Sequence, residues 1–486
     1  GNIMFLLKNL FVQITLNFIL EKYILWCRKV FMKIKLNFIY NLSIISLIVL
    51  LIVGHQLNKK NSSSKKNEIF NLTQQSISKN NQISKIQKNL LSSEQNINNF
   101  MNPENINFQK ILEDKELENF ESLKMSQYRT DEILFSGNYN ASGTAYIDFF
   151  NDDKELVLAT VDGIFAFAKI ENFENFIKIQ SNIFDLITYD DFYTNYDYGI
   201  KDILISKNDL FVSLIGQKKK ECHNIKILKS EMNKSNLNFE VFYETPECVN
   251  KNNDHGYLAA QGGGGRMFTN NNSIFLTTGE FRNRPLAQDS EKAYGKILNI
   301  DLNLKNMNII SLGHRNPQGL YYSVKHDFII STEHGPKGGD EININHKPLS
   351  KIKNYGWPIS SYGEHYYKNY PTKILNQAPL NKSHKKFGFI EPIKYFVPSI
   401  GISQIVPLNE KDTEFLVGAM GNEVAEQDLG LHYIILNDDR KKVINHKYIP
   451  LNERVRDMIV SKDRKMIILF LETTSSLAIL KKQTVN

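Results

Sequence analysis

Three short runs in the second half of the chain combine glycine with side chains that bind anions. They read GHRNPQGL at 313–320, EHGPKGGDEIN at 333–343 and NYGWP at 354–358. Arg315 and Asn316 offer a planar fork of donors beside an amide, which suits carboxylate oxygens. The three runs are therefore the candidate ligand-binding segments of the chain.

These runs, in this order, form a specific signature. Together with QGGGGRMF at 261–268 and TTGEF at 277–281, they resemble the soluble aldose dehydrogenases that use pyrroloquinoline quinone (PQQ), the glucose/sorbosone dehydrogenase family. The resemblance covers roughly residues 130–482. It implies a PQQ- and calcium-dependent enzyme that oxidises an aldose sugar at C1 to its lactone and passes electrons to an unidentified acceptor.

The resemblance assigns roles to several residues. In the family, the residues that match Arg315 and Asn316 contact the quinone. The carbonyls that match Gly335 and Pro336 ligate the Ca²⁺ that bridges to PQQ, and carbonyl oxygen suits so hard a cation. His334 stands beside these carbonyls, where it would line the mouth of the cofactor site.

Arg454 and Arg456, in RVRD, match a late pair that holds the cofactor's carboxylates. Taken alone, an arginine in such a loop more often forms a surface or interblade salt bridge. Glu341 and Tyr355 match residues near a second Ca²⁺ in some members. Glu341 could equally cap a turn, so that metal stays unassigned. His314 is expected to be structural.

One departure from the family affects catalysis directly. The histidine that acts as general base stands four residues before the arginine of H-x-x-G-R, and this position is Gly262 here. The aspartate that orients it becomes Glu280. Two alternatives follow: Glu280 or His255 replaces the base, or the protein is a catalytically degenerate, membrane-tethered module that binds a ligand or a partner.

A repeat in the sequence predicts the strands that place these residues. An apolar strand, a polar turn and a second strand recur six times, and the copies start at Thr144, Gly199, Gly264, Pro317, Gly401 and Arg454. One blade cannot bury both of its faces, whereas a closed ring of blades can. The repeat predicts an all-β, six-bladed β-propeller over 128–486, and a large β-sandwich is the alternative.

The chain carries a formal net charge of +7, and residues 1–127 hold 16 basic and 9 acidic residues. The remaining residues hold 43 of each sign, which argues against a globular nucleic-acid reader. The uncharged stretch 36–54 would span roughly 28 Å as a helix, close to a bilayer's thickness. It predicts a transmembrane or signal-anchor helix, with a cleaved signal or a core helix as alternatives.

The rest of the N-terminal region gives weaker signals. Residues 1–35 are left unassigned, and 55–127, rich in Asn, Ser, Lys and Gln, are predicted to form a polar linker or stalk. With an anchor, the propeller would lie on the exported, periplasmic or extracytoplasmic side. There, Cys222 and Cys248, which bracket a predicted hairpin, could form a disulfide.

Overall fold

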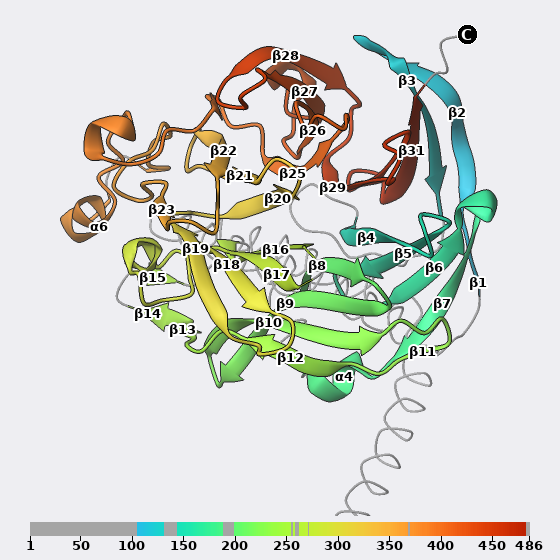
Figure 1. The fold of residues 1–486 in the computed structure, drawn as a ribbon, viewed down its shortest axis with the longest axis horizontal. Helices are drawn as coiled ribbons and strands as arrows, with labels where there is room; N and C mark the ends of the chain where they lie inside the picture. Colours follow the sequence, from blue (N-terminus) through green and yellow to red (C-terminus); the bar gives the residue numbers. More distant parts are fainter. Residues whose placement is uncertain are drawn as a thin grey trace, which may run out of the picture. The chain divides into compact units, whose positions relative to one another are not determined.

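The computed structural model describes residues 105–130, 143–187, 199–253, 256–257, 262–270, 272–367 and 370–482. These residues belong to one compact unit, Ser92–Asn486, in which six antiparallel sheets are arranged around a common centre (Figure 1). Each sheet is one blade of a β-propeller, so the predicted all-β fold is confirmed.

The first three blades are built mainly from residues 145–312, and two short strands join them from outside this range. Blade 1 consists of β4 (Ala145–Phe150), β5 (Glu155–Thr160), β6 (Phe165–Lys169) and β7 (Asn175–Ser181), with β1 (Asn105–Asn107) and β11 (Asn236–Leu237) beside β7. Blade 2 consists of β8 (Gly199–Ser206), β9 (Asp209–Lys219), β10 (Cys222–Glu231) and β12 (Glu240–Glu244), with β13 (Val249–Asn250) beside β10. Blade 3 consists of β16 (Gly264–Thr269), β17 (Ser273–Thr278), β18 (Lys296–Asp301), β19 (Met307–Leu312) and β23 (Lys353–Asn354).

The other three blades complete the ring. Blade 4 consists of β20 (Pro317–Ser323), β21 (Phe328–Glu333), β22 (Asp340–His346) and β24 (Lys394–Phe396). Blade 5 consists of β25 (Ile402–Pro407), β26 (Glu414–Ala419), β27 (Gly430–Leu436) and β28 (Val443–Pro450). Blade 6 consists of β29 (Val455–Val460), β30 (Met466–Leu471), β31 (Ser476–Lys482), β3 (Phe120–Arg129) and β2 (Gln109–Leu117).

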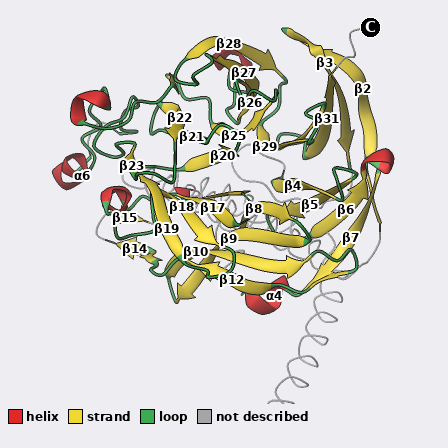
Figure 2. Ribbon diagram, in the orientation of Figure 1, coloured by secondary structure: helices red, strands yellow, loops and turns green. Residues whose placement is uncertain are grey.

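Within the described residues, helix is confined to short connections (Figure 2). These are α4 (Ile183–Leu186), α6 (Thr372–Gln377) and the 3₁₀ turns η1 (Ile170–Asn172), η3 (Arg284–Gln288), η4 (Lys385–Phe387) and η5 (Val424–Glu426). A small hairpin pairs β14 (Asn252–Asn253) with β15 (Gly256–Tyr257).

The ring is closed by the innermost strand of each blade. Each of β4, β8, β16, β20, β25 and β29 contacts the next in this order, and β29 contacts β4. The six predicted hairpins are therefore the two inner strands of the six blades. The second strand of blade 6, β30 (MIILFL), is apolar and almost wholly buried because a neighbouring blade covers each face.

The hydrophobic core lies between blades. Six of its clusters each join two neighbouring blades, and one of these packs Phe275 and Ile297 of blade 3 against Leu320 and Tyr322 of blade 4. This arrangement excludes the sandwich alternative, because no blade supplies a core alone.

A buried arginine ties the inner strands together near the centre. Arg266 Nη1 donates to Asp202 Oδ1 and to Asp457 Oδ1, each at 2.7 Å, and Arg266 Nε donates to the Gln318 carbonyl at 3.0 Å. Asp457 Oδ2 in turn accepts the Ile147 amide at 2.9 Å. Five of the six blades share this network, whose buried charges are paired.

The predicted boundary between linker and propeller at 127/128 is too late. Strand β3 pairs with β31, and β2 pairs with β3, so residues before 128 complete blade 6. The sequence of β2 is polar because this edge strand is mostly exposed, and polar strands resemble a linker. The segments 1–35 and 36–54 and residues 55–104 lie outside the described residues. Within the described part of the chain, no helix is long and apolar enough to cross a membrane.

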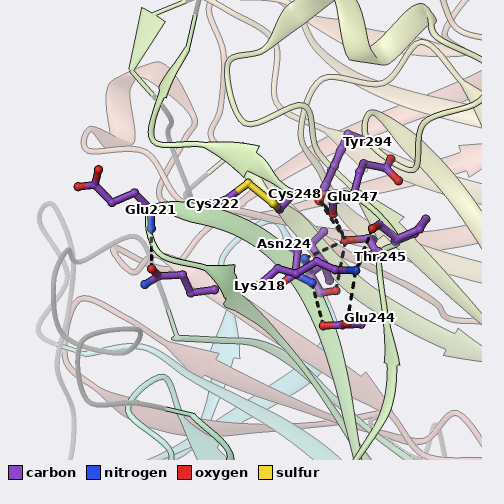
Figure 3. The surroundings of a disulfide bond; sticks show 12 residues. Lys218, Glu221, Cys222, Asn224, Glu244, Thr245, Glu247, Cys248 and Tyr294 are labelled. Carbon is purple, nitrogen blue, oxygen red and sulfur yellow. Dashed lines mark hydrogen bonds and ion pairs between the residues drawn. A yellow bond between two sulfur atoms is a disulfide. The ribbon is translucent and has the colours of Figure 1, made fainter.

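Blade 2 carries the predicted disulfide. Cys222 at the start of β10 is bonded to Cys248, and β10 and β12 between them form the expected antiparallel pair (Figure 3). Next to the bond, the Glu247 carbonyl accepts the Tyr294 hydroxyl at 2.6 Å, and Glu247 Oε1 accepts the Ala293 amide at 2.5 Å. The disulfide-linked loop of blade 2 thereby holds the β17–β18 connection of blade 3.

Candidate active site

The turn after β17 places Glu280 beside the glycine-rich run. Gly279 N donates to the Gly263 carbonyl at 2.7 Å, and a Cβ atom on Gly279 would lie 1.8 Å from the Gly262 carbonyl oxygen. Only glycine permits this approach. Gly262, the position of the family's base, therefore packs directly against the backbone that carries Glu280.

Glu280 is a buried carboxyl group with an unsatisfied oxygen. Its side chain is 4% exposed, and its Oε2 has no hydrogen-bond partner among the described residues. Burial raises the pKa of Glu280 to about 7, against the opposing charges of Arg315, Arg284 and Arg282. A carboxyl group with this pKa exchanges a proton readily near neutral pH.

Arg315 is fixed by a buried histidine–glutamate pair. Glu333 Oε1 bonds His314 Nδ1 at 3.0 Å, while Glu333 Oε2 accepts the Arg315 amide at 2.8 Å. The guanidinium donates to the His334 carbonyl at 3.0 Å and lies 5.5 Å from the centre of the Trp357 ring. His314 is fully buried and structural, as expected, and the pair orients Arg315.

Asn316 links blades 3 and 4 below this arginine. Its Oδ1 accepts the Gly264 amide at 3.2 Å and Gln318 Nε2 at 2.9 Å, and its carbonyl accepts the His334 amide at 3.1 Å. These contacts fix the amide plane, and Nδ2 has no hydrogen-bond partner in the described part of the chain.

Arg454 and Arg456 share one carboxylate from blade 6. Glu472 Oε2 accepts Arg454 Nε at 3.2 Å, and Glu472 Oε1 accepts Arg456 Nε at 2.5 Å. Arg454 also donates to the carbonyls of Met420 and Gly421. Each guanidinium keeps an Nη2 group without a partner among the residues described here, and two cations share one anion. In the described residues, Glu472 is the one carboxylate that forms a salt bridge with both.

The charges of the site arginines act together on the side chain of His334. Burial lowers the pKa of His334 to about 4, the charge of Asp340 opposes this, and the charges of Arg315, Arg456 and Arg454 lower the pKa further. His334 is therefore neutral at physiological pH, and arginines of two different blades act on it. The structure thus brings together most of the predicted site residues.

The turn that follows His334 is held by hydrogen bonds that do not use the carbonyl groups of Gly335 and Pro336. Asp340 Oδ1 accepts the Gly335 amide at 2.9 Å, and Asp340 Oδ2 accepts the Ile402 amide at 2.9 Å. In the described residues, no group donates a hydrogen bond to the carbonyl of Gly335 or of Pro336. These carbonyls remain available to a cation, although no cluster of three acidic, His or Cys side chains with metal-ligand spacing occurs in the described residues.

The remaining candidate residues are Glu341, Tyr355 and His255. Glu341 Oε1 bonds His384 Nε2 at 3.0 Å, and Tyr355 donates to the Ile344 carbonyl at 2.8 Å, so both have protein partners. His255 lies outside the described residues. Sequence reasoning missed Glu472, the counter-ion of the arginine pair, because nothing in its local sequence distinguishes it from a strand-end glutamate.

Comparison with known proteins shows the family of this chain. The model of the Glucose / Sorbosone dehydrogenase family matches residues 176–479, more than half of the chain. The chain belongs to this family. The match contains every candidate site residue discussed above.

Two curated relatives of this family member are partial matches. Aldose sugar dehydrogenase YliI of Escherichia coli is 27% identical over 255 residues, which cover 49% of this chain and 62% of the relative. Quinoprotein glucose dehydrogenase B of Acinetobacter calcoaceticus is 34% identical over 106 residues, which cover 18% and 21% of the two chains. The matched segments thus span less than two thirds of either relative.

Solved structures support the fold. The apo form of the soluble aldose sugar dehydrogenase of E. coli matches with a TM-score of 0.54 and 20% identity, over 70% of this chain and 96% of that chain. A crystal structure of a glucose dehydrogenase matches with a TM-score of 0.55 and 21% identity over the same shares. At these identities the likeness is one of fold.

Proposed function

We propose that this protein oxidises an aldose sugar at C1 to its lactone with PQQ and Ca²⁺, and passes the electrons to an acceptor. The observation that carries the proposal is the buried, unsatisfied carboxyl group of Glu280, next to Arg315 and to the position of the family's base. Family membership and the names of the two curated relatives support the same reaction class.

The residues present fit a planar, anionic cofactor. Arg315, Arg454 and Arg456 provide guanidinium groups with free donors, and the last two share the single carboxylate of Glu472. The carbonyls of Gly335 and Pro336 are the candidate ligands for Ca²⁺. When bound, PQQ would supply the electron-accepting quinone that takes a hydride from the sugar.

The chain's own residues would act on the proton and on the developing charge. Glu280 Oε2 would accept the proton of the C1 hydroxyl, because its pKa of about 7 leaves much of it ionised at neutral pH. Arg315, held by its amide and by Trp357, would stabilise negative charge that develops near its guanidinium. Neutral His334 would line the site without repelling the arginines.

Titration with PQQ and Ca²⁺, followed by aldose-dependent reduction of a dye, tests the proposal. Saturable PQQ binding with turnover is expected, and the absence of PQQ binding would refute it. Binding without turnover would favour the degenerate binding module, which the loss of the family's histidine at Gly262 makes the second candidate.

We also propose that the propeller lies outside the cytoplasm, tethered by a helix at 36–54. The Cys222–Cys248 bond supports an oxidising compartment, because disulfides are rare in the cytosol. Thiol labelling of intact cells and of the chain after denaturation tests this. Cysteines 222 and 248 that become labelled without prior reduction would contradict it.

A further inference from the structure

We propose that residues 347–397, called the basic lobe below, dock on an anionic lipid surface. The inference does not depend on the sugar dehydrogenase activity. It rests on the charge, the exposed apolar side chains and the anchoring of this one segment, which connects β22 to β24 and beyond.

The basic lobe has a net positive charge, whereas the rest of the propeller has more acidic than basic residues. It contains nine lysines, two glutamates and no arginine, whereas the remainder of 128–486 contains 34 basic and 41 acidic residues. A propeller without net charge is therefore strongly polarised. Such a concentration of one sign directs the molecule toward a surface of the opposite sign.

The lysines of the basic lobe are not neutralised within the protein. None of its eight described lysines forms a salt bridge with any other described residue. Lys373, Lys385 and Lys386 are exposed. Of the exposed lysines described in the basic lobe, only Lys382 donates a side-chain hydrogen bond, to the Gly363 carbonyl at 2.5 Å.

Exposed apolar side chains occur among these lysines. Of the sixteen large hydrophobic side chains exposed in the described residues, nine lie in the basic lobe. Tyr367 is 71% exposed, Val397 61% and Phe387 46%, and Phe387 directly follows two of the lysines. The nine exposed apolar side chains of the basic lobe are Leu349, Ile352, Tyr366, Tyr367, Leu375, Phe387, Ile390, Tyr395 and Val397.

The described residues of the basic lobe, 347–367 and 370–397, are fixed to the rest of the fold. Figure 1 shows the segment with α6 projecting from the ring of blades beside β22 and β23. Trp357 packs with Ala287 of blade 3, the Tyr362 and Tyr395 rings stack at 3.8 Å, and the backbone of Lys337 pairs with that of Glu364. A rigid projection presents its side chains without a large ordering cost.

Lipid is favoured over a protein partner by the choice of residues. Protein interfaces are depleted of lysine and enriched in arginine, and the basic lobe shows the reverse. Lysine with tyrosine, phenylalanine and leucine is typical of interfacial membrane binding, where apolar groups enter the headgroup boundary and lysines attract anionic lipid. The predicted anchor at 36–54 would keep the basic lobe close to such a surface.

The experiment places an environment-sensitive fluorophore on the full-length protein. The variant Phe387→Cys in a Cys27→Ser background is labelled and added to phosphatidylcholine vesicles with or without phosphatidylglycerol. Val241→Cys on β12, which is 42% exposed, is the matched control outside the basic lobe. A blue shift at position 387 with phosphatidylglycerol, reversed by salt, is expected, with no shift at 241.

Charge variants separate this contact from anchoring by the N-terminal segment. Replacing Lys373, Lys385 and Lys386 with Gln is expected to weaken docking of the basic lobe roughly a hundredfold. The same change at exposed lysines elsewhere should have no effect. This control set consists of Lys219, Lys220 and Lys411.

Three results would overturn the proposal. They are an absent shift at position 387, a shift that needs no anionic lipid, and a shift that survives the triple lysine change. A response to soluble polyglutamate but not to vesicles would assign the basic lobe to an acidic protein instead. PQQ binding, measured on the same variants, reports separately on the proposed enzyme.

Discussion

The substitution Glu280→Gln tests the proposed base and its effect on stability in one variant. Burial raises the pKa of this carboxyl group from 4.5 to about 7, so the folded protein holds a proton that the unfolded chain has released between these values. Stability contributed by this group is therefore lost as pH rises through this window. Above pH 7 the destabilisation is constant, at about 3 kcal/mol.

Glutamine is neutral at every pH and still accepts a backbone hydrogen bond at this position. We expect the Gln variant to exceed the parent protein in stability by up to about 3 kcal/mol near pH 8, and by close to zero below about pH 5. Urea denaturation of the protein without added cofactor, at several pH values, measures the difference.

The same variant is expected to lose turnover by at least about a hundredfold, because the amide cannot take a proton. The parent's activity should rise with pH and level off above about 7. Glu155→Gln is the matched control. Glu155 lies on blade 1 and is also buried, but its Oε1 is paired with Lys234 Nζ at 2.6 Å. This control should keep its activity and gain no stability.

Two results would refute the reasoning about Glu280. Retained turnover in the Gln variant would exclude it as the base. Equal stability of variant and parent near pH 8 would show that the ionised carboxylate is not destabilised by burial, and the assigned pKa would be wrong.

Three further predictions concern the glycine-rich run, the disulfide and the central arginine. Gly262→His should raise turnover about tenfold or more, because a Cβ atom there meets no atom within 4 Å and an imidazole can act as base. Replacing Cys222 and Cys248 with Ser should lower the free energy of unfolding by about 3 kcal/mol, as expected for a separation of 26 residues. Arg266→Met should lower it by about 3–5 kcal/mol, because two buried carboxylates lose their cation. Dye reduction measures the first change, and urea denaturation measures the other two.

Each of these predictions has its own control. Gly262→Gln fills similar space without a base, and equal activity of the Gln and His variants would contradict the first. Reduction of the parent protein should reproduce the loss seen on replacing the cysteines, and a loss in only one of the two would contradict the second. The loss from Arg266→Met should shrink at acid pH, where the carboxyl groups are protonated, and a constant loss would contradict the third.

Local signals were enough to predict the fold. The six hairpins start where the sequence repeat starts, because two adjacent strands and their turn depend on nearby residues. The same logic failed for β2 and β3. Strand β3 pairs with β31 at the far end of the chain, and β2 pairs with β3. As the exposed edge strand of the blade, β2 has the polar composition of a linker.

The order of residue types along the chain is fixed before folding, and it was enough to recognise the candidate site residues. It contains Arg315, Asn316, Arg454 and Arg456, and it lacks a histidine at position 262. Residue types and spacing are local properties, so a resemblance to a family can be recognised from them.

Only the tertiary structure decided what these residues can do. Closure of the ring brings arginines of two blades near His334, and it buries Glu280 so that its pKa rises to about 7. Burial and neighbouring charge arise from segments far apart in the chain, and they are therefore absent from any local pattern.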